Sequence, residues 1–189
     1  MKISETSLPG VLLIKPRIIG DPRGYFVETF QASRYREAGI KCDFVQDNLS
    51  MSSKGVLRGL HLQEPMAQDK LVYVVSGSVF DVAVDVRVNS PSYGKWVGEE
   101  LNAENAHQLF IPRGFAHGFF VLSETVLFAY KCSNAYSAEN EITISWNDPD
   151  IDIVWPEQNP VLSEKDLCGM SLRDIPDTEL PAFSAEHCG

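Results

Sequence analysis

The sequence predicts a mainly β fold, an antiparallel sandwich or barrel with a few short helices. Short apolar runs recur along the chain, separated by turn signals rich in Gly, Pro, Asp and Ser, as in all-β domains. Residues 80–88 alternate Val or Phe with Asp, Ala or Arg, the period of a strand with one buried and one polar face. The middle of the chain has no sustained helical period. A barrel of this kind holds its ligand on side chains that point inward.

The individual elements follow in chain order. An apolar run over residues 11–19 ends at a strong turn over 20–24, and residues 25–30 resume a β pattern. Residues 32–38 indicate a short helix, with Ser33 as its cap and Gly39 as its stop. Further strands are expected at residues 72–75, 79–88, 107–112, 117–131 (bending near 123–124) and 141–146. A last short helix is expected at 163–170 with Ser163 as its cap, and an extended, weakly ordered segment from 174 onward.

The bulk properties indicate one domain and narrow the class of ligand. A chain of 189 residues suits a single core, so we expect one domain over residues 1–170 and an extended C-terminal tail over 171–189. The net charge of −10 argues against general binding to nucleic acids or anionic membranes, but a few cations in one pocket could still bind an anion. No transmembrane run and no signal-peptide pattern occurs. Free thiols in a reducing cytoplasm are expected at the scattered Cys42, Cys132, Cys168 and Cys188.

The densest chemistry lies in residues 56–63, where Arg58 and His61 are three positions apart in an otherwise apolar run. In a regular strand these two side chains would face opposite sides, whereas His61 and Gln63 share a face. Gly59 permits a bulge that could turn Arg58 and His61 toward one cavity. A histidine beside fixed cations suits proton transfer on an anionic substrate. From these residues alone, two side chains on a strand surface are an equal alternative.

Residues 112–117 have the Pro-x-Gly-x-x-His spacing of the second motif of cupin barrels, which are jelly rolls. A plain turn followed by a histidine is the alternative. The first cupin motif supplies His-x-His and a glutamate as metal ligands, but here Gln63 follows His61 and Lys70 occupies the glutamate position. A divalent metal would lose two ligands and meet a positive charge. The prediction is a cupin/jelly-roll antiparallel β-barrel whose pocket carries acid–base residues in place of a metal.

Beyond these motifs, the chain resembles the dTDP-4-dehydrorhamnose 3,5-epimerase family, cupin-type enzymes of deoxysugar biosynthesis. The matching stretches run in order through about residues 10–170. They are residues 21–28 (DPRGYFVE), 44–48 (FVQDN), 56–61 (VLRGLH), 79–85 (VFDVAVD), 111–119 (IPRGFAHGF), 130–131 (YK), 136–137 (YS), 146–148 (WND) and 162–166 (LSEKD). The resemblance implies epimerisation of dTDP-4-dehydro-6-deoxy-D-glucose at C3 and C5, giving dTDP-4-dehydro-L-rhamnose in dTDP-L-rhamnose biosynthesis.

The resemblance also implies roles for particular residues. His61 would be the general base, oriented by the carboxylate of Asp166. Tyr130 would be the general acid on the opposite face of the sugar, and Lys70 the cation near the keto oxygen. The residues implied to bind the nucleotide-sugar are Arg23, Phe26, Glu28, Gln46, Asp47, Asn48, Arg58, His117, Tyr136, Glu141 and Lys165.

The implied chemistry asks for these residue types. A 4-keto group acidifies the protons on both neighbouring carbons, and removing one gives an enolate whose oxygen needs a positive charge nearby. Inversion needs a base on one face of the ring and a proton donor on the other. No redox cofactor is required, in agreement with the absence of a Gly-x-Gly-x-x-Gly fingerprint. Because such barrels pair their strand edges, we expect a homodimer.

Alternatives remain at each level. Asp166 would otherwise be a surface residue at a helix start, where an acid favours the helix dipole. Tyr130 and Tyr136 would otherwise be aromatics of the core or barrel mouth, and Glu28 and Glu141 solvated strand residues. Packing residues that have some chance of stacking on the base are Phe26, Phe119 and Trp146. For the whole protein the alternatives are an epimerase inverting only C3 or only C5, a non-catalytic nucleotide-sugar-binding cupin, and a metal-dependent cupin enzyme.

Overall fold

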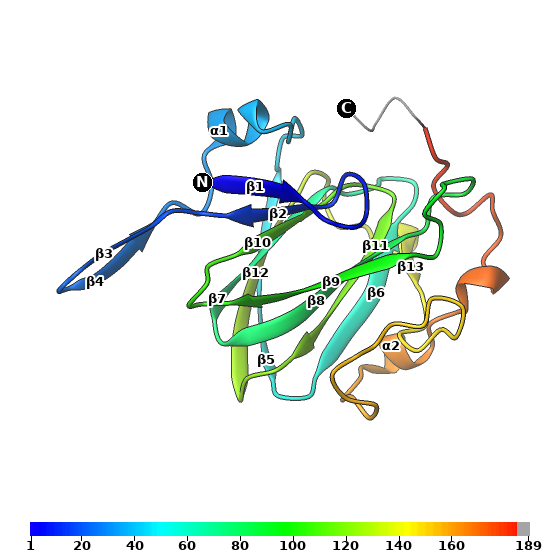
Figure 1. Cartoon of the computed structure of the whole chain (residues 1–189). Coiled ribbons are helices and arrows are strands. Elements are labelled where there is room, and N and C mark those ends of the chain that lie inside the picture. The colour runs from blue at the N-terminus through cyan, green and yellow to red at the C-terminus, as the bar shows by residue number, and fades with distance from the viewer. Residues whose placement is uncertain (185–189) are drawn as a thin grey trace.

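Two antiparallel sheets packed face to face form the body of the molecule, and a third, two-stranded sheet projects from it (Figure 1). The structure is a computed structural model that describes residues 1–184. The first sheet has the order β1-β2-β10-β7-β12-β5, and the second has the order β13-β6-β11-β8-β9. The predicted antiparallel β-barrel of cupin type is confirmed.

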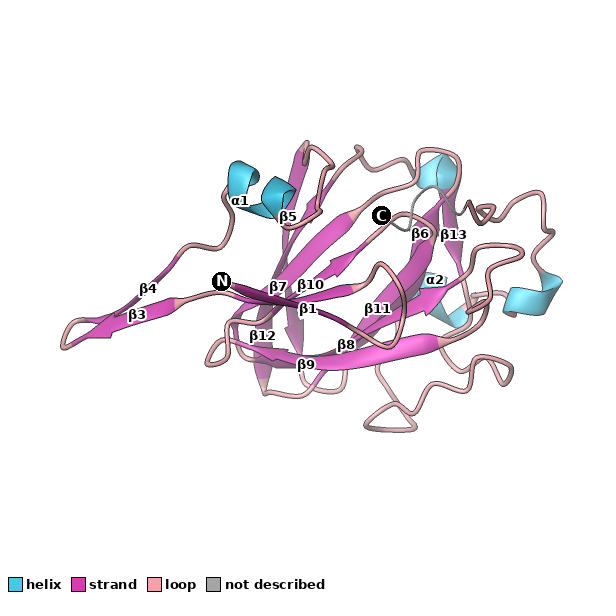
Figure 2. Cartoon of the chain, turned by 45° about the horizontal axis from the view of Figure 1, so that its top comes forward, coloured by secondary structure: helices cyan, strands magenta, loops and turns pink. Residues whose placement is uncertain are grey.

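The strands of the first sheet are β1 (Lys2–Glu5), β2 (Leu12–Lys15), β10 (Gln108–Ile111), β7 (Lys70–Ser76), β12 (Thr125–Cys132) and β5 (Gln46–Ser53). Those of the second sheet are β13 (Glu141–Thr143), β6 (Leu57–Gln63), β11 (Phe115–Val121), β8 (Ser78–Asp85) and β9 (Trp96–Asn102). The projecting hairpin consists of β3 (Ile18–Asp21) and β4 (Gly24–Val27). The short helices α1 (Ala32–Glu37), α2 (Glu164–Leu167), η1 (Ala138–Asn140) and η2 (Leu172–Asp174) lie at the periphery (Figure 2).

Many of the predicted elements are present with local differences, whereas β1, β5 and β9 were not predicted. The run over residues 11–19 forms two strands rather than one, because Pro16 lacks a backbone N–H and interrupts the ladder. Helix α1 is capped by the side chain of Gln31, which accepts from the Arg34 N–H at 3.2 Å, rather than by Ser33. Ser163 caps α2 as predicted, accepting from the Asp166 N–H at 3.2 Å, but the helix ends at Leu167.

Strand β8 has both faces buried, although its alternating pattern predicted a polar face. Ala83 packs into the apolar cluster between the two sheets, and Val82 and Val84 pack into a second cluster on the opposite face of the same sheet. Asp81 and Asp85 are fully buried and bonded to His117 and Arg87 respectively. The polar positions of this strand therefore support internal ion pairs instead of facing water.

The C-terminal segment covers the outer face of the second sheet. Leu172, Ile175 and Leu180 are buried in the cluster that contains Val82 and Val84. The prediction of a weakly ordered segment from residue 174 onward is therefore wrong for residues 174–184. Two widely spaced apolar side chains, Ile175 and Leu180, anchor these residues, and two are too few to give a periodic signal. The division of the chain at residue 170 stays a prediction.

Free thiols are present at Cys42, Cys132 and Cys168, while the prediction for Cys188 falls outside the described residues. Within residues 1–184, no helix has the length and apolar character of a membrane span.

An ion pair between the buried Asp69 and the half-exposed Arg113, at the ends of strands of the first sheet, makes the stability of the fold depend on pH. Asp69 accepts hydrogen bonds from the side chain of Arg113 at 2.7 Å and from the Ser133 hydroxyl at 2.9 Å. Burial alone would raise the pKa of Asp69, but the bonds from Arg113 and Ser133 outweigh it and hold the pKa below its ordinary 3.8. Because the pKa of Asp69 is lower in the folded than in the unfolded state, its ionised form stabilises the fold. This stabilisation is complete above the unfolded-state pKa and is lost as the pH falls through the folded-state pKa.

We therefore expect Asp69→Asn to flatten the fall in stability between about pH 5 and pH 2, at the cost of lower stability at pH 7. Urea titrations at several pH values measure both effects. The matched control is Asp152→Asn, an exposed position where Asn suits the positive φ of 52° and the pH dependence should match the wild type. Identical acid profiles for all three proteins would contradict the prediction.

Candidate active site

A bulge in β6 turns Arg58 and His61 to the same side. In the β6–β11 ladder, His61 lies opposite His117 and Arg58 lies opposite Phe119. The two paired positions are therefore three residues apart on β6 but only two residues apart on β11. The extra residue makes a bulge. Gly59 has a φ of +124°, and a Cβ there would lie 2.5 Å from the Cα of Gly118. Only glycine meets both demands, and the predicted bulge is confirmed.

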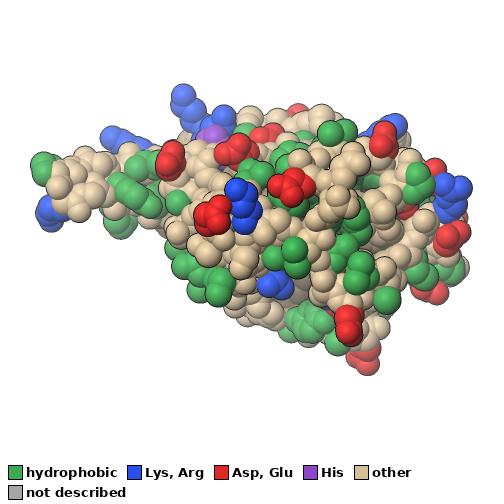
Figure 3. All heavy atoms as spheres, turned by 90° about the horizontal axis from the view of Figure 1, so that it is seen from below, with side chains coloured by type: hydrophobic (Ala, Val, Ile, Leu, Met, Phe, Trp, Pro, Cys, Tyr) green, Lys and Arg blue, Asp and Glu red, His purple; other side chains and the backbone are tan. Residues whose placement is uncertain are grey.

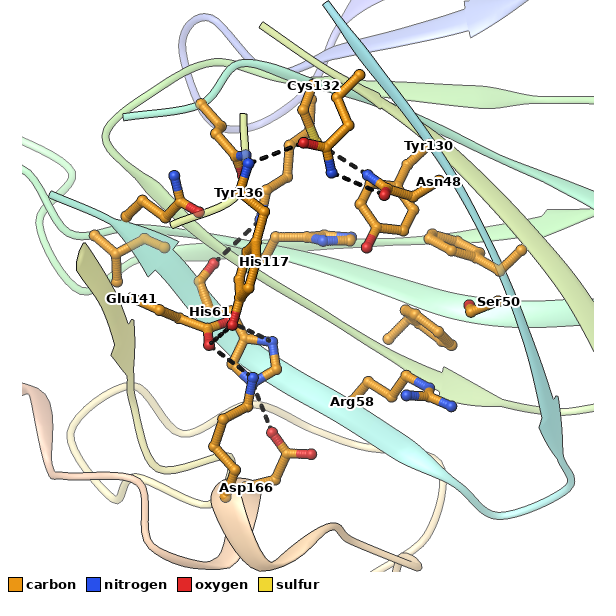
Figure 4. Close-up of a pocket in the computed structure, with 18 of the residues that line it drawn as sticks. Asn48, Ser50, Arg58, His61, His117, Tyr130, Cys132, Tyr136, Glu141 and Asp166 are labelled. Atoms are coloured by element: carbon orange, nitrogen blue, oxygen red, sulfur yellow. Dashed lines mark hydrogen bonds and ion pairs between the residues drawn. The ribbon is translucent and has the colours of Figure 1, made fainter. Parts of the chain in front are cut away.

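The bulge opens onto a cavity of about 380 Å³ between the two sheets (Figure 4). Of the residues that the sequence analysis assigned to the site, those that line it are His61, Lys70, Tyr130, Asp166, Gln46, Asn48, Arg58, His117, Tyr136, Glu141 and Lys165. They come from strands of both sheets and from α2, which explains why they are scattered along the chain.

His61 and Asp166 form a tight pair on one wall. The Nε2 of His61 is 2.6 Å from Oδ1 of Asp166, whose side chain is only 3% exposed. Asp166 also accepts from the Ser163 hydroxyl at 2.7 Å. Burial raises the pKa of Asp166, but the hydrogen bonds from His61 and Ser163 lower it by more, so the carboxylate stays ionised. An ionised Asp166 holds the proton on Nε2 and leaves the lone pair of His61 on Nδ1.

A chain of hydrogen bonds lies beside His61 in the lining of the cavity. Oε1 of Glu141 lies 4.0 Å from Nδ1 of His61, and Oε2 of Glu141 accepts from the Tyr136 hydroxyl at 3.0 Å and from Nζ of Lys165 at 2.9 Å. Burial raises the pKa of Glu141, yet Lys165 and the charge of His61 lower it overall. Glu141 is thus a half-buried anion rather than a solvated strand residue, able to stabilise a protonated His61.

Tyr130 lies on the opposite wall from His61, because β12 belongs to the first sheet and β6 to the second (Figure 4). Burial, with a smaller effect from Cys132, raises the pKa of the Tyr130 phenol. A phenol with a raised pKa keeps its proton at neutral pH. The cavity therefore holds an imidazole on one wall and a protonated phenol on the other.

Lys70 brings an amine to the lining of the cavity. It pairs with Cys132 in the β7–β12 ladder, and its Nζ donates to the carbonyl oxygen of His61 at 3.4 Å. Burial lowers the pKa of the ammonium, while Cys132, Glu141 and Asp81 oppose that shift. An ammonium held in a low-dielectric cavity interacts strongly with any negative charge formed there.

A second histidine–aspartate pair lies deeper. Nε2 of His117 is 3.0 Å from Oδ2 of Asp81, and both side chains are buried. Burial raises the pKa of Asp81, against the effects of His117 and Lys70. His117 was predicted as a site residue, whereas Asp81 was read only as part of an alternating strand. In the β8–β11 register Asp81 lies opposite Phe119, two positions from His117, and the local sequence pattern does not indicate that these strands pair.

Four of the expected binding residues lie away from this cavity. Arg23 and Phe26 are on the projecting hairpin, where Arg23 pairs with Asp21 and the Phe26 ring is 67% exposed. Glu28 pairs with Arg34 of α1 at 2.8 Å. Asp47 points to the outer face of the first sheet and pairs with Lys131 at 2.8 Å. The chain does not bring these four side chains to its own cavity.

The side chain of Gln63 is committed to shaping the loops at the mouth. Its Nε2 donates to the carbonyl oxygens of Met66 and Ala135 at 3.0 and 3.3 Å, and its Oε1 accepts from the Ser137 N–H at 2.9 Å. Within the described residues, no three His, Cys, Asp or Glu side chains gather as a metal would require. Cavity residues that the sequence analysis did not assign to the site are Ser50, Leu62, Gln68, Phe119, Phe128, Cys132 and Ser163.

A cupin barrel with a histidine–carboxylate base on one wall and a phenol on the other defines an isomerase that works by acid–base chemistry. The family model described as dTDP-4-dehydrorhamnose 3,5-epimerase matches residues 5–174. A relative with that description from Shigella flexneri is 55% identical over 176 residues, covering 92% of this chain and 97% of its own. The chain belongs to the dTDP-4-dehydrorhamnose 3,5-epimerase family.

Solved structures of epimerases are similar to this chain in both fold and sequence. The Legionella pneumophila dTDP-6-deoxy-D-glucose-3,5-epimerase in complex with dTDP-4-keto-L-rhamnose has a TM-score of 0.95 and 50% identity, covering 97% of this chain and 99% of its own. A 3'-monoepimerase from Streptomyces bikiniensis in complex with dTDP-quinovose has a TM-score of 0.88 and 32% identity, covering 94% of this chain and 91% of its own. The chain is therefore similar both to double epimerases and, at lower identity, to a single-carbon epimerase.

Proposed function

We propose that this enzyme converts dTDP-4-dehydro-6-deoxy-D-glucose to dTDP-4-dehydro-L-rhamnose by inverting C3 and C5, within dTDP-L-rhamnose biosynthesis. The observation that carries the proposal is the placement of His61 with Asp166 on one wall and Tyr130 on the other, 
with Lys70 between the sheets. The names of the relatives and the dTDP-4-keto-L-rhamnose bound by the Legionella pneumophila enzyme support the choice of substrate.

Each inversion removes one proton from a ring carbon of the sugar and returns one proton to the opposite face of the same carbon. Nδ1 of His61 takes the proton from the carbon next to the ketone, and the C–H electron pair forms the double bond of an enolate whose charge rests on the C4 oxygen. Lys70 stabilises that charge. Tyr130 then delivers its proton to the opposite face, and the ketone re-forms. Exchange of the gained and lost protons with solvent resets His61 and Tyr130 before the second carbon reacts.

The outer part of the cavity suits the dTDP group. The guanidinium of Arg58 is oriented by two hydrogen bonds: Nε donates to the Ser52 hydroxyl at 2.9 Å, and Nη2 donates to the Met51 carbonyl oxygen at 3.5 Å. This orientation leaves Nη1 to meet a diphosphate. Lys165 adds a second cation at the mouth, and Gln46 and Asn48 of β5 line the wall opposite Arg58. These cations are concentrated in one place in a protein whose net charge is −10.

Deuterium exchange tests the proposal. In D₂O, the wild type should place solvent deuterium at both C3 and C5 of dTDP-4-dehydro-6-deoxy-D-glucose. Proton NMR of the products measures this uptake as the loss of the C3 and C5 proton signals. Exchange at a single carbon would replace the proposal with a single-carbon epimerase, the second candidate that the Streptomyces bikiniensis neighbour favours. Exchange at neither carbon would leave a binding protein. A chelator should not alter the rate.

We further propose that the enzyme is a cytoplasmic homodimer in which the β3–β4 hairpin of each copy reaches the cavity of the other. The free thiols of the described residues suit a reducing compartment. The hairpin carries exposed Ile19, Tyr25 and Phe26, and hydrophobic side chains lie along the projecting arm in Figure 3. An exposed apolar arm of this kind usually marks an interface. It also carries Arg23, which the chain's own cavity does not use.

Mixing inactive variants tests the exchange of hairpins. His61→Asn removes the base and Arg23→Glu reverses a hairpin charge, and each variant alone should be nearly inactive. When the two variants are co-expressed, about half of the dimers should contain one chain of each kind. Each mixed dimer has one intact site of two, in which His61 of one chain meets Arg23 of the other, so the activity should return to about a quarter of the wild-type value. Light scattering should give about twice the 21.0 kDa chain mass. A monomeric mass, or no recovery of activity on mixing, would contradict the proposal.

A further inference from the structure

Ser50 has a buried hydroxyl that the free protein leaves unbonded. Alternate side chains of β5 line the cavity, and Ser50 lies between Asn48 and Ser52 in that row. Among the buried side-chain nitrogen and oxygen atoms of residues 1–184, Oγ of Ser50 is the one without a hydrogen-bond partner. Such atoms are rare in native proteins, because losing water without gaining a partner is unfavourable.

The neighbours of Ser50 on the same face are all bonded. The amide of Asn48 accepts from Gln46 at 2.9 Å, and Oγ of Ser52 accepts from Arg58 at 2.9 Å. Ser50 instead pairs with Phe128 in the β5–β12 ladder. Phe128 and Phe119 line the cavity with their ring centroids 4.1 Å apart. The hydroxyl thus interrupts an apolar part of the wall, where an alanine would pack without any unsatisfied group.

The position of Ser50 points to the sugar rather than the nucleotide. Figure 4 shows Ser50 on the side of the cavity that holds Tyr130 and Arg58, across from His61. A hexose whose reacting carbons lie between His61 and Tyr130 presents its own ring hydroxyls to this wall. The neutral hydroxyl of Ser50, which lies opposite Phe128 in the ladder, suits a neutral hydroxyl partner, whereas a phosphate would prefer the cations at the mouth.

We propose that Oγ of Ser50 hydrogen-bonds a ring hydroxyl of the bound hexose and makes the enzyme selective for hydroxylated over deoxygenated 4-keto sugars. The inference rests on the proposed function, whose substrate it refines. A site built to bond a hydroxyl discriminates against the analogue lacking it, because the protein group is then left unpaired. Ser50 is a binding and specificity residue, and it takes no proton from the reacting carbons.

The test compares Ser50→Ala with Ser53→Ala, the same substitution on the exposed face of the same strand. The rates are measured on dTDP-4-dehydro-6-deoxy-D-glucose and on its 2-deoxy and 3-deoxy analogues, using exchange at C5. Ser50→Ala should lower kcat/KM about tenfold on the full substrate and leave the rate on one analogue unchanged. Ser53→Ala should match the wild type on all three.

An equal loss on all three substrates, or a loss on none, would overturn the inference while the wild type's exchange still upheld the proposed function. No exchange by the wild type would overturn both. Thermal melting separates binding from folding: Ser50→Ala should melt at or above the wild-type temperature, because it loses no hydrogen bond, whereas Ser52→Ala should melt lower. A fall for Ser50→Ala as large as that for Ser52→Ala would show a bond in the free protein and overturn the inference. Ser50→Cys, which keeps the side-chain size but bonds weakly, should repeat the kinetic result.

Discussion

Replacing His61 with asparagine should lower kcat by about 10²–10⁴-fold and abolish deuterium uptake at both C3 and C5, since a positioned general base contributes about that much. Asparagine keeps a polar side chain of similar reach beside Asp166 but cannot accept a proton at neutral pH. The 2.6 Å contact between Nε2 of His61 and Asp166 holds the imidazole in one orientation. Binding of the substrate depends mainly on other residues, so KM should change much less than kcat.

The matched control is His107→Asn, which removes a histidine that does not line the cavity. It should retain wild-type kinetics. Asp166→Asn provides a graded comparison, because it leaves the imidazole in place but removes the charge that orients it, and its kcat should lie between those of the wild type and His61→Asn. Full turnover by His61→Asn would show that the base is another group.

Gly59→Ala should destabilise the protein by about 3 kcal/mol or more, which for a domain of this size corresponds to a melting temperature about 10 °C lower. Two penalties combine at this position. A side chain at a φ of +124° is strained, and its Cβ would lie 2.5 Å from the Cα of Gly118 and 2.8 Å from the carbonyl oxygen of His117. Both contacts are backbone atoms of β11, so relief requires the two strands to separate.

Two further glycines isolate these penalties. Gly55 also has a positive φ, of +77°, but nothing lies within 4 Å of its added Cβ, so Gly55→Ala should cost only about 1 kcal/mol. Gly118 has no positive φ, but its Cβ would lie 2.8 Å from the Arg58 carbonyl oxygen, so Gly118→Ala should show the crowding alone. Calorimetry or urea titration measures all three. A Gly59→Ala protein as stable as Gly55→Ala would mean that β6 carries no tight bulge.

The strands that the sequence predicts well are those buried on both sides. The alternation around Val82 and the turn at Gly77 gave β8 because packing demands β-branched side chains there. Strand β5 was missed, since its inward side chains, among them Asn48 and Ser50, are polar: they face the cavity rather than the core. A strand that lines a polar site therefore has the composition of a loop.

The site shows the same division. Local pattern was enough to predict that Gly59 lets Arg58 and His61 share a cavity, because a bulge involves adjacent residues. The pairing of His61 with Asp166 joins positions 105 residues apart, and only the family resemblance indicated it. The outward positions of Arg23 and Phe26 could not be predicted either, because a short hairpin pattern does not say in which direction the hairpin leaves the barrel.

The position of Asp166 outside the barrel has a consequence for biosynthesis. The strands of both sheets end at Thr143, whereas the carboxylate that orients His61 arrives with α2, more than twenty residues later. During translation the strands leave the ribosome first, and the barrel can close around a histidine whose partner has yet to be made. The alignment of His61 thus comes only after every strand of the barrel has been made, and a chain cut short before α2 would have the strands of the barrel but an imidazole without its carboxylate partner.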